Sequence, residues 1–321
     1  MKKLFPEIQP FHTFFLETGS QHSVYVEQSG NPEGLPVIFL HGGPCSGTRP
    51  DHRRFFHPEK YHIILFDQRA CGFSIPFGEL EKNTTQDLLE DMERIRSHLG
   101  IEKWLLFGGS WGATLALLYA QRFTRHVEAM ILRGVFLARQ KDMDWFLEEG
   151  AGRIYPEQWH RLVKTLPGKK NQSMLERIFE GLWGQDEVAR LRVAREWDSW
   201  GGLVALGTEY QIFQDEKHVN RKLLMQVRME LHYAINNYFI EENQVLNHCH
   251  KISSVRTVII HGRNDFVCPI EAGFSLHCAL PDAEYIVLSD AGHVAQGEAM
   301  IDALVSATEN IYAEISGGIN N

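Results

Sequence analysis

The sequence lacks the long apolar runs and basic clusters that mark membrane-spanning and nucleic-acid-binding proteins. It contains no run of 18 apolar residues, so no transmembrane helix is predicted. The opening MKKLFPEIQPFHTFF has two lysines, but prolines and polar residues interrupt the apolar region that a signal peptide needs. The formal net charge is −9, and no lysine or arginine cluster is long enough to follow a phosphate backbone. We therefore expect neither a membrane nor a nucleic acid as a partner.

Cysteine is also scarce. The chain has five, an odd number: Cys45, Cys71, Cys249, Cys268 and Cys278. They are scattered without the spacing of metal ligands, a pattern typical of reduced thiols in a cytosolic protein. We therefore predict a cytoplasmic protein with no structural disulfide and no metal site.

What the sequence does contain is enough apolar material for a large core. At 321 residues and 44% hydrophobic composition, one domain with a large insertion, or two domains, is expected. Short apolar or β-branched runs alternate with helical patterns at both ends of the chain, which predicts a mostly parallel sheet with helices on both faces. The predicted strands are His22 to Gln28, Val37 to Leu40, His62 to Phe66, Trp104 to Phe107, Ala129 to Leu132, Arg256 to Ile260 and Glu284 to Leu288. A capped helix is predicted from about Asn83 to Gly100.

The middle of the chain has a different pattern. From about Ala138 to His248 no clear strand pattern occurs, and amphipathic segments are separated by Gly and Pro. These segments are Asp144 to Glu149, Glu157 to Lys164, Ser173 to Leu182 and Asp186 to Trp197. We therefore predict a helical cap at 138–248, inserted between the two parts of one α/β core at 1–137 and 249–321.

One serine stands among glycines at a predicted strand-to-helix junction. Gly108-Gly109-Ser110-Trp111-Gly112 follows an apolar run and precedes a helical pattern. This is the G-x-S-x-G pattern, in which a sharp turn exposes the serine hydroxyl above the sheet. The other interpretation is an ordinary glycine-rich turn.

A nucleophilic serine needs a base and an acid that orients the base. Asp265 ends the loop after the predicted strand at 256–260, and His293 follows the next strand. The order Ser110, Asp265, His293, each after a strand, predicts a catalytic triad at the sheet edge where such folds bind ligands. His261 is the nearest competitor for the base, but it lies close to its strand and precedes the aspartate.

The oxyanion of an acyl-transfer reaction needs two donors. One is expected to be the backbone N–H of Trp111, the residue after the serine. The loop His41-Gly42-Gly43-Pro44-Cys45, after an early strand, is expected to supply the other, which we assign to Gly43.

Several motifs together resemble the prolyl aminopeptidases, or proline iminopeptidases, of the α/β-hydrolase superfamily. The resemblance covers most of the chain, cap included. The motifs are HGGP at 41–44, DQRACGFS at 67–74, NTTQDLLEDMERIR at 83–96, GGSWGATLALLYA at 108–120, DWFLEEGAGRIYPEQW at 144–159, GRND at 262–265 and AGH at 291–293. The resemblance implies an α/β-hydrolase fold with an inserted helical cap. It also implies release of an N-terminal residue, typically proline, from small peptides. The implied serine mechanism uses no metal and no cofactor.

The resemblance also implies how the substrate amine is recognised, by paired cap carboxylates. One family glutamate corresponds to Glu230. The position of the second holds Gly201, and Glu196 or Asp198 would have to substitute, although on a helix we expect both to face elsewhere. The cap aromatics Trp197, Trp200 and Tyr233 are expected to pack on a prolyl ring.

Other departures from the family pattern lie beside the expected site. HGGPG is HGGPC here, with Cys45, and DQRGCGRS is DQRACGFS, with Ala70 and Phe73. Two other functions stay open. One is an esterase or amide hydrolase acting on substrates without a free amine, which Gly201 keeps in play, and the other is a non-catalytic binding protein that retains the fold.

Overall fold

Eight strands of the described part of the chain form one sheet. The computed structural model describes all residues except 148–149, 169–170, 208–209, 211–219 and 319–321. The strand order is β1-β2-β4-β3-β5-β6-β7-β8. β1 and β2 pair antiparallel and β2 pairs antiparallel with β4, whereas β4, β3 and β5 to β8 are parallel. The strands are β1 His12–Glu17, β2 Ser23–Gly30, β3 Leu35–Leu40, β4 Tyr61–Phe66, β5 Trp104–Gly109, β6 Val127–Arg133, β7 Arg256–Gly262 and β8 Glu284–Leu288.

The mostly parallel sheet predicted from the sequence is confirmed, and each of the seven predicted strands is present with small shifts at its ends. The sequence analysis missed β1. This edge strand alternates exposed and partly buried residues without a strong apolar face, so its pattern carried little signal.

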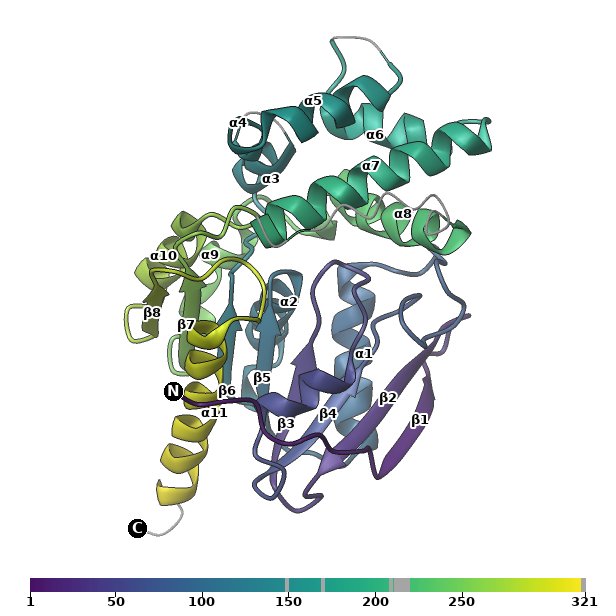
Figure 1. Cartoon of the computed structure of the whole chain (residues 1–321). Helices are drawn as coiled ribbons and strands as arrows, with labels where there is room; N and C mark the ends of the chain where they lie inside the picture. Colours follow the sequence, from purple (N-terminus) through teal and green to yellow (C-terminus); the bar gives the residue numbers. More distant parts are fainter. Residues whose placement is uncertain (148–149, 169–170, 208–209, 211–219, 319–321) are drawn as a thin grey trace.

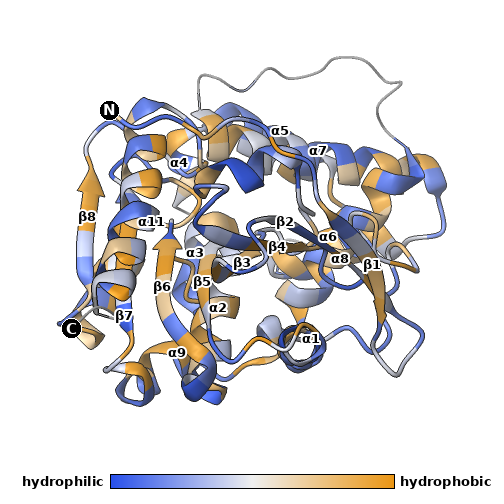
Figure 2. Cartoon of the chain, turned by 90° about the horizontal axis from the view of Figure 1, so that it is seen from below, coloured by the Kyte–Doolittle hydropathy of each residue, from blue (hydrophilic) through white to orange (hydrophobic). Residues whose placement is uncertain are grey.

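Helices cover both faces of the sheet because successive side chains of each central strand point to opposite faces. In β5, Trp104 and Leu106 pack into one apolar cluster, and Leu105 and Phe107 pack into the other. The first cluster joins the sheet to α1 Thr85–His98, α2 Trp111–Arg122, α9 Gln244–Asn247 and α10 Ile270–Ala279. The second joins it to α11 Glu298–Gly318 and the 3-10 helix η1 Pro50–Phe55. In Figure 2, α11 shows both hydrophobic and hydrophilic residues along its length, as expected for a helix with one buried face.

Helices that follow β6 lie above one edge of the sheet (Figure 1). We call α3 to α8 the helical layer. They are α3 Gln140–Leu147, α4 Ala151–Ile154, α5 Pro156–Thr165, α6 Met174–Trp183, α7 Glu187–Leu206 and α8 Arg221–Ile235. Most of the buried residues of the layer form an apolar cluster of their own. Short 3-10 helices follow at η5 Asn237–Phe239 and η6 Cys249–Ile252, and another, η2 Thr124–His126, precedes β6.

Each of the four predicted amphipathic segments falls on a helix of this layer, except that residues 148–149, the end of the first segment, lie outside the described residues. The sequence analysis did not single out α8. The domain limits at 138 and 248 stay a prediction. Among the described helices, none combines the length and apolar character needed to cross a membrane.

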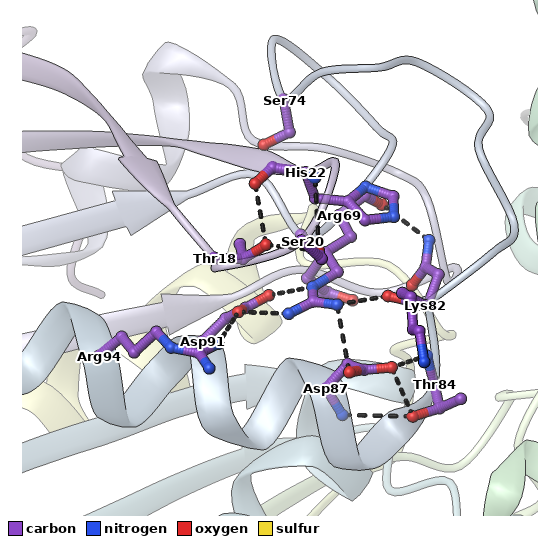
Figure 3. Close-up of polar contacts among 12 residues, drawn as sticks. Thr18, Ser20, His22, Arg69, Ser74, Lys82, Thr84, Asp87, Asp91 and Arg94 are labelled. Carbon is purple, nitrogen blue, oxygen red and sulfur yellow. Dashed lines mark hydrogen bonds and ion pairs between the residues drawn. The ribbon is translucent and has the colours of Figure 1, made fainter.

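A buried arginine fixes the loop that follows β4 (Figure 3). The guanidinium of Arg69 binds both carboxylate oxygens of Asp91 at 2.5 and 2.8 Å, lies 3.2 Å from Asp87, and donates to the carbonyl of Lys82. Asp87 also accepts from the backbone and hydroxyl of Thr84, which caps α1. Because Arg69 and Asp91 are buried, this pairing locks the β4 loop to α1.

Candidate active site

Ser110 occupies a strained turn between β5 and α2. Its φ of 56° and ψ of −125° are backbone angles that residues other than glycine rarely adopt. The flanking glycines are required by close backbone approach: a Cβ on Gly108 would lie 2.3 Å from the carbonyl oxygen of Gly112, and one on Gly112 would lie 2.0 Å from that of Leu40. The turn therefore has the geometry predicted for a nucleophile elbow.

His293 and Asp265 meet at the carboxyl ends of β7 and β8. Nδ1 of His293 donates to Oδ2 of Asp265 at 2.8 Å. The other carboxylate oxygen accepts the backbone N–H groups of Val267 and Cys268 at 3.0 and 2.8 Å. Burial acts to raise the pKa of Asp265, but the charge and hydrogen bond of His293 outweigh it and lower that pKa. An ionised Asp265 on Nδ1 leaves Nε2 of His293 free to accept a proton.

β6 connects the serine turn to the histidine loop. The carbonyl of Arg133 accepts the N–H of Ser110 at 2.9 Å, and the Arg133 guanidinium donates to the carbonyl of His293. The next residue, Gly134, leaves no room for a side chain, because a Cβ there would lie 3.0 Å from Oδ2 of Asp265. Ser110 and His293 line the same cavity.

His261, the competing base in the sequence analysis, lies outside the lining of this cavity. It is buried, its Nε2 donates to the carbonyl of Cys268 at 2.8 Å, and the same nitrogen lies 3.5 Å from Oδ2 of Asp265. Burial lowers its pKa, so it remains a neutral support for the aspartate loop.

The predicted oxyanion donors lie on the two sides of the serine turn. Trp111 is the first residue of α2, where backbone N–H groups have no partner within the helix. Gly43 lines the cavity with φ of 113°, and a Cβ on the preceding Gly42 would be 3.4 Å from Cβ of Ser110. The structure therefore brings both backbones to the serine, and their role stays a prediction.

The sequence analysis missed Gln68, which connects these two segments. Its side chain accepts from Nε1 of Trp111 at 2.9 Å and donates to the carbonyl of His41 at 2.9 Å. Its backbone N–H donates to Nε2 of His41 at 3.0 Å. The signal was available, because Gln68 lies in the motif DQRACGFS, directly after a predicted strand.

The cavity above Ser110 has a volume of about 290 Å³ and lies between the sheet edge and the helical layer. Apolar and aromatic side chains make up much of its wall, including Phe136, Phe146 and Trp197. Its charged side chains are acidic: Asp142, Asp198 and Glu230. No lysine or arginine occurs among its described lining residues.

Asp142 forms an ion pair with an arginine outside the cavity lining, whereas Asp198 and Glu230 have no such partner among the described residues. Asp142 pairs with Arg139 at 2.6 Å. Glu230, on α8, accepts a hydrogen bond from Nε1 of Trp197 at 2.8 Å. Burial of its carboxyl group, with a smaller contribution from the charge of Asp198, raises the pKa of Glu230 to about 7. Partial desolvation also raises the pKa of Asp198.

Comparison with known proteins identifies the family to which this chain belongs. Residues 36–299 match the family model described as alpha/beta hydrolase fold. The chain is 40% identical to the proline iminopeptidase of Xanthomonas citri, over 96% of this chain and 99% of the relative, and 41% identical to that of Xylella fastidiosa, over 97% and 99%. The proline iminopeptidase of Arabidopsis thaliana is 40% identical over 97% of this chain and 83% of its own. The chain belongs to the proline iminopeptidase family of α/β hydrolases.

Solved structures outside this family share the fold. A bromoperoxidase from Bacillus anthracis has a TM-score of 0.62 at 18% identity, covering 93% of this chain and 97% of its own. An esterase from Exiguobacterium antarcticum has a TM-score of 0.59 at 20% identity, covering 92% and 96%. These likenesses show the fold alone.

The predicted substrate-contacting aromatics separate into two groups. Trp197 lines the cavity. Trp200 and Tyr233 are buried and absent from its described lining: the indole of Trp200 donates to the carbonyl of Phe146, and the hydroxyl of Tyr233 donates to Asn83 at 2.7 Å. These two side chains are therefore placed outside the described wall of the cavity, and their packing on a prolyl ring stays a prediction.

Two carboxylates on α7 could replace the one that Gly201 lacks, and only one of them lies in the cavity wall. Glu196 faces away from the cavity and pairs with Arg161 and Arg195 at 2.7 and 3.1 Å, as expected. Asp198 lies in the cavity wall beside Gly201, so the expectation that it faces elsewhere is wrong. Residues three apart share a helix face, and this spacing was visible in the sequence.

The described residues contain no group of three or more His, Cys, Asp or Glu side chains arranged to hold a metal ion. The five cysteines are free; Cys268 lines the cavity, and Cys45 and Cys71 are close enough for their thiols to interact. The groups gathered around Ser110 are of the types that acyl transfer needs: a hydroxyl, an imidazole bonded to a carboxylate, backbone N–H groups and further carboxylates.

Proposed function

We propose that this chain is a prolyl aminopeptidase, which releases N-terminal proline from small peptides through an acyl-enzyme. Family membership supports this assignment at 40–41% identity over nearly the whole chain. The observation that carries it is one cavity containing Ser110, His293 and Glu230. A hydrolase of esters needs the first two, whereas a buried carboxylate in the same cavity suits a substrate with a cationic end.

In the proposed reaction the substrate amine binds as an ammonium ion against Glu230, which places the prolyl carbonyl at Ser110. Oγ of Ser110 attacks the carbonyl carbon while Nε2 of His293 takes the hydroxyl proton. Asp265 orients the imidazole and stabilises the imidazolium ion. The backbone N–H groups of Gly43 and Trp111 bind the oxyanion of the tetrahedral intermediate.

Collapse of this intermediate breaks the peptide bond. His293 returns the proton to the leaving amine, so the shortened peptide departs and the prolyl group stays esterified to Ser110. Water then attacks the ester, with His293 again taking and returning one proton, which frees proline and the serine. No further reactant is required.

An esterase acting on substrates without a free amine is the second candidate, and Gly201 is the observation that favours it. The family carboxylate implied at this position is absent. A second carboxylate in a charge-assisted bond contributes about 1.5–3 kcal/mol, so its loss would weaken binding of an ammonium ion about tenfold or more.

The test is serine-dependent turnover of three chromogenic substrates: proline p-nitroanilide, its N-acetylated form and p-nitrophenyl butyrate. We expect the free-amine substrate to be cleaved far faster than the acetylated one, and Ser110→Ala to abolish both this activity and fluorophosphonate labelling. Ser253→Ala, at an exposed serine remote from the cavity, is the matched control. Turnover of the ester alone would establish the second candidate, and an intact protein that neither turns over nor labels would be a binding protein.

The same proposal includes a cytoplasmic location. The five cysteines are all unpaired and four of them are buried, as expected for a chain that folds under reducing conditions. Fractionation of cells expressing the tagged protein tests it, and recovery from the secreted or membrane fraction would contradict it.

A further inference from the structure

The cavity has an unfilled space where the family pattern implies a glutamate. Gly201 lines the cavity from α7, and a Cβ built on it would meet no atom of the described residues within 4 Å. Its neighbour Gly202 has no such space, since a Cβ there would lie 2.3 Å from the ring of Tyr210. A side chain at position 201 would therefore point into free volume.

Asp198 lies three residues before Gly201 on the same face of α7, and its side chain is exposed to the cavity. Among the described residues its carboxylate makes no hydrogen bond or ion pair, unlike that of Glu196 two positions earlier. A carboxylate that lines a partly desolvating cavity without a partner is available to a ligand.

Glu230 faces Asp198 from α8. Among the residues that the structure describes, its carboxylate accepts from one donor, the neutral indole N–H of Trp197. The charge of Asp198 acts on Glu230 directly, so the two carboxylates repel one another across the cavity. No cation among the described lining residues offsets this repulsion. The missing component of the arrangement is a positive charge supplied from outside the protein.

We infer that Asp198 and Glu230 together bind the ammonium group of the substrate, with Asp198 replacing the carboxylate that Gly201 lacks. This inference rests on the proposed peptidase function and names a specificity-determining residue for it. Moving the second carboxylate back by almost one helical turn keeps it on the cavity face. The shift leaves the space at Gly201 open beside the bound amine.

The experiment measures binding of the amine separately from peptide cleavage. Hydrolysis of p-nitrophenyl butyrate is assayed with prolinamide as a competitive inhibitor and N-acetylprolinamide as its uncharged counterpart. Asp198→Asn keeps the side-chain shape and removes the charge. Glu187→Gln removes an exposed carboxylate from the first turn of the same helix, outside this cavity, and is the control.

We expect Asp198→Asn to raise the inhibition constant of prolinamide about 10- to 100-fold, by analogy with other hydrogen bonds to charged groups. The rate of ester hydrolysis without inhibitor is measured for each variant as the reference for its inhibition constant, and all values for Glu187→Gln should stay within about twofold of those of the unmodified protein. The double variant Asp198→Asn, Gly201→Glu should recover most of the affinity, since the new side chain enters the open space. If Asp198 had only a structural role, a glutamate at position 201 would not restore the affinity for prolinamide.

Failure of the inference can be told from failure of the proposed function. If the protein cleaves proline p-nitroanilide but Asp198→Asn leaves prolinamide inhibition unchanged, or lowers ester hydrolysis equally, the inference is wrong and the peptidase stands. If the protein turns over only the ester while prolinamide still competes through Asp198, the inference holds and the peptidase assignment is wrong. If the ester alone is turned over and prolinamide does not inhibit, both are wrong.

Discussion

Replacing Glu230 with glutamine should stabilise the protein while removing its selectivity for amines. The structure raises the pKa of this carboxyl from 4.5 to about 7, mainly through burial and, to a lesser degree, through Asp198. The folded protein therefore keeps a proton that the unfolded chain releases, so stability falls as the pH rises between these two values and stays lowered above them. This rise in the pKa corresponds to a destabilisation of about 3 kcal/mol at pH 8 and of less than about 1 kcal/mol at pH 5.

Glutamine avoids this penalty because it carries no charge, and its carbonyl can still accept from the indole of Trp197. The other titratable groups facing Glu230 are Asp198 on α7, Tyr238 on η5 and, through Tyr238, Asp142 on α3, and glutamine leaves all three in place. Since about 1 kcal/mol moves the melting temperature by about 2–4 °C in domains of 150–250 residues, a rise of several degrees is expected at pH 8.

Thermal unfolding followed by circular dichroism at pH 5 and pH 8 measures this difference. Glu187→Gln, which also removes one negative charge from the helical layer, is the control for net charge. The Glu230→Gln protein should also lose the preference for proline p-nitroanilide over its acetylated form. If Glu230→Gln raised the melting temperature equally at both pH values, or raised it less at pH 8 than at pH 5, the reasoning would be refuted.

Three further predictions concern the triad, the Arg69 network and α7. Asp265→Asn should lower kcat about 10⁴-fold for amide and ester substrates alike, as seen when a triad aspartate is replaced in a chymotrypsin-type protease, and a loss below tenfold would exclude it from the triad. Asp91→Ala should cost about 3–5 kcal/mol in urea unfolding because Arg69 loses its buried partner, and a cost below about 1 kcal/mol would contradict this. Gly201→Ala should raise the free energy of unfolding by up to about 1 kcal/mol, since its methyl group meets no atom of the described residues within 4 Å. Gly202→Ala should lower it, since the new Cβ would lie 2.3 Å from a ring carbon of Tyr210. The same sign for both variants would be inconsistent with the packing.

The chemistry of the site could be predicted because it depends on strand ends and on backbone constraints. Ser110, Asp265 and His293 each follow a strand, and in a parallel sheet those ends lie on one edge. The structure brings His293 and Asp265 within 2.8 Å. The β4 loop was not predicted in this way, since the contacts of Gln68 join residues far apart in sequence and leave no periodic signal.

Which face of a helix a residue occupies was predicted less well. Glu196 and Asp198 are two positions apart, so they point in different directions, and only the first was placed correctly. Trp197 and Trp200 are both apolar and buried, so composition could not separate the one in the cavity wall from the one inside the helical layer. Both pack into the apolar cluster of the helical layer, and only Trp197 belongs to the described lining of the cavity.

Recognition and chemistry are therefore carried by different parts of the chain. Ser110, Asp265 and His293 follow strands of the sheet, and the backbone turns around them leave little room for change. Asp198 and Glu230, the two cavity carboxylates without an ion pair among the described residues, belong to α7 and α8, and Gly201 lines the same cavity from α7. If the inferred amine site needs only a negative charge on the cavity face of α7, its carboxylate can occupy different positions along that helix while the position of Ser110 is unchanged. Substitutions on α7 should therefore alter which substrates bind without altering how fast an ester reacts with the serine.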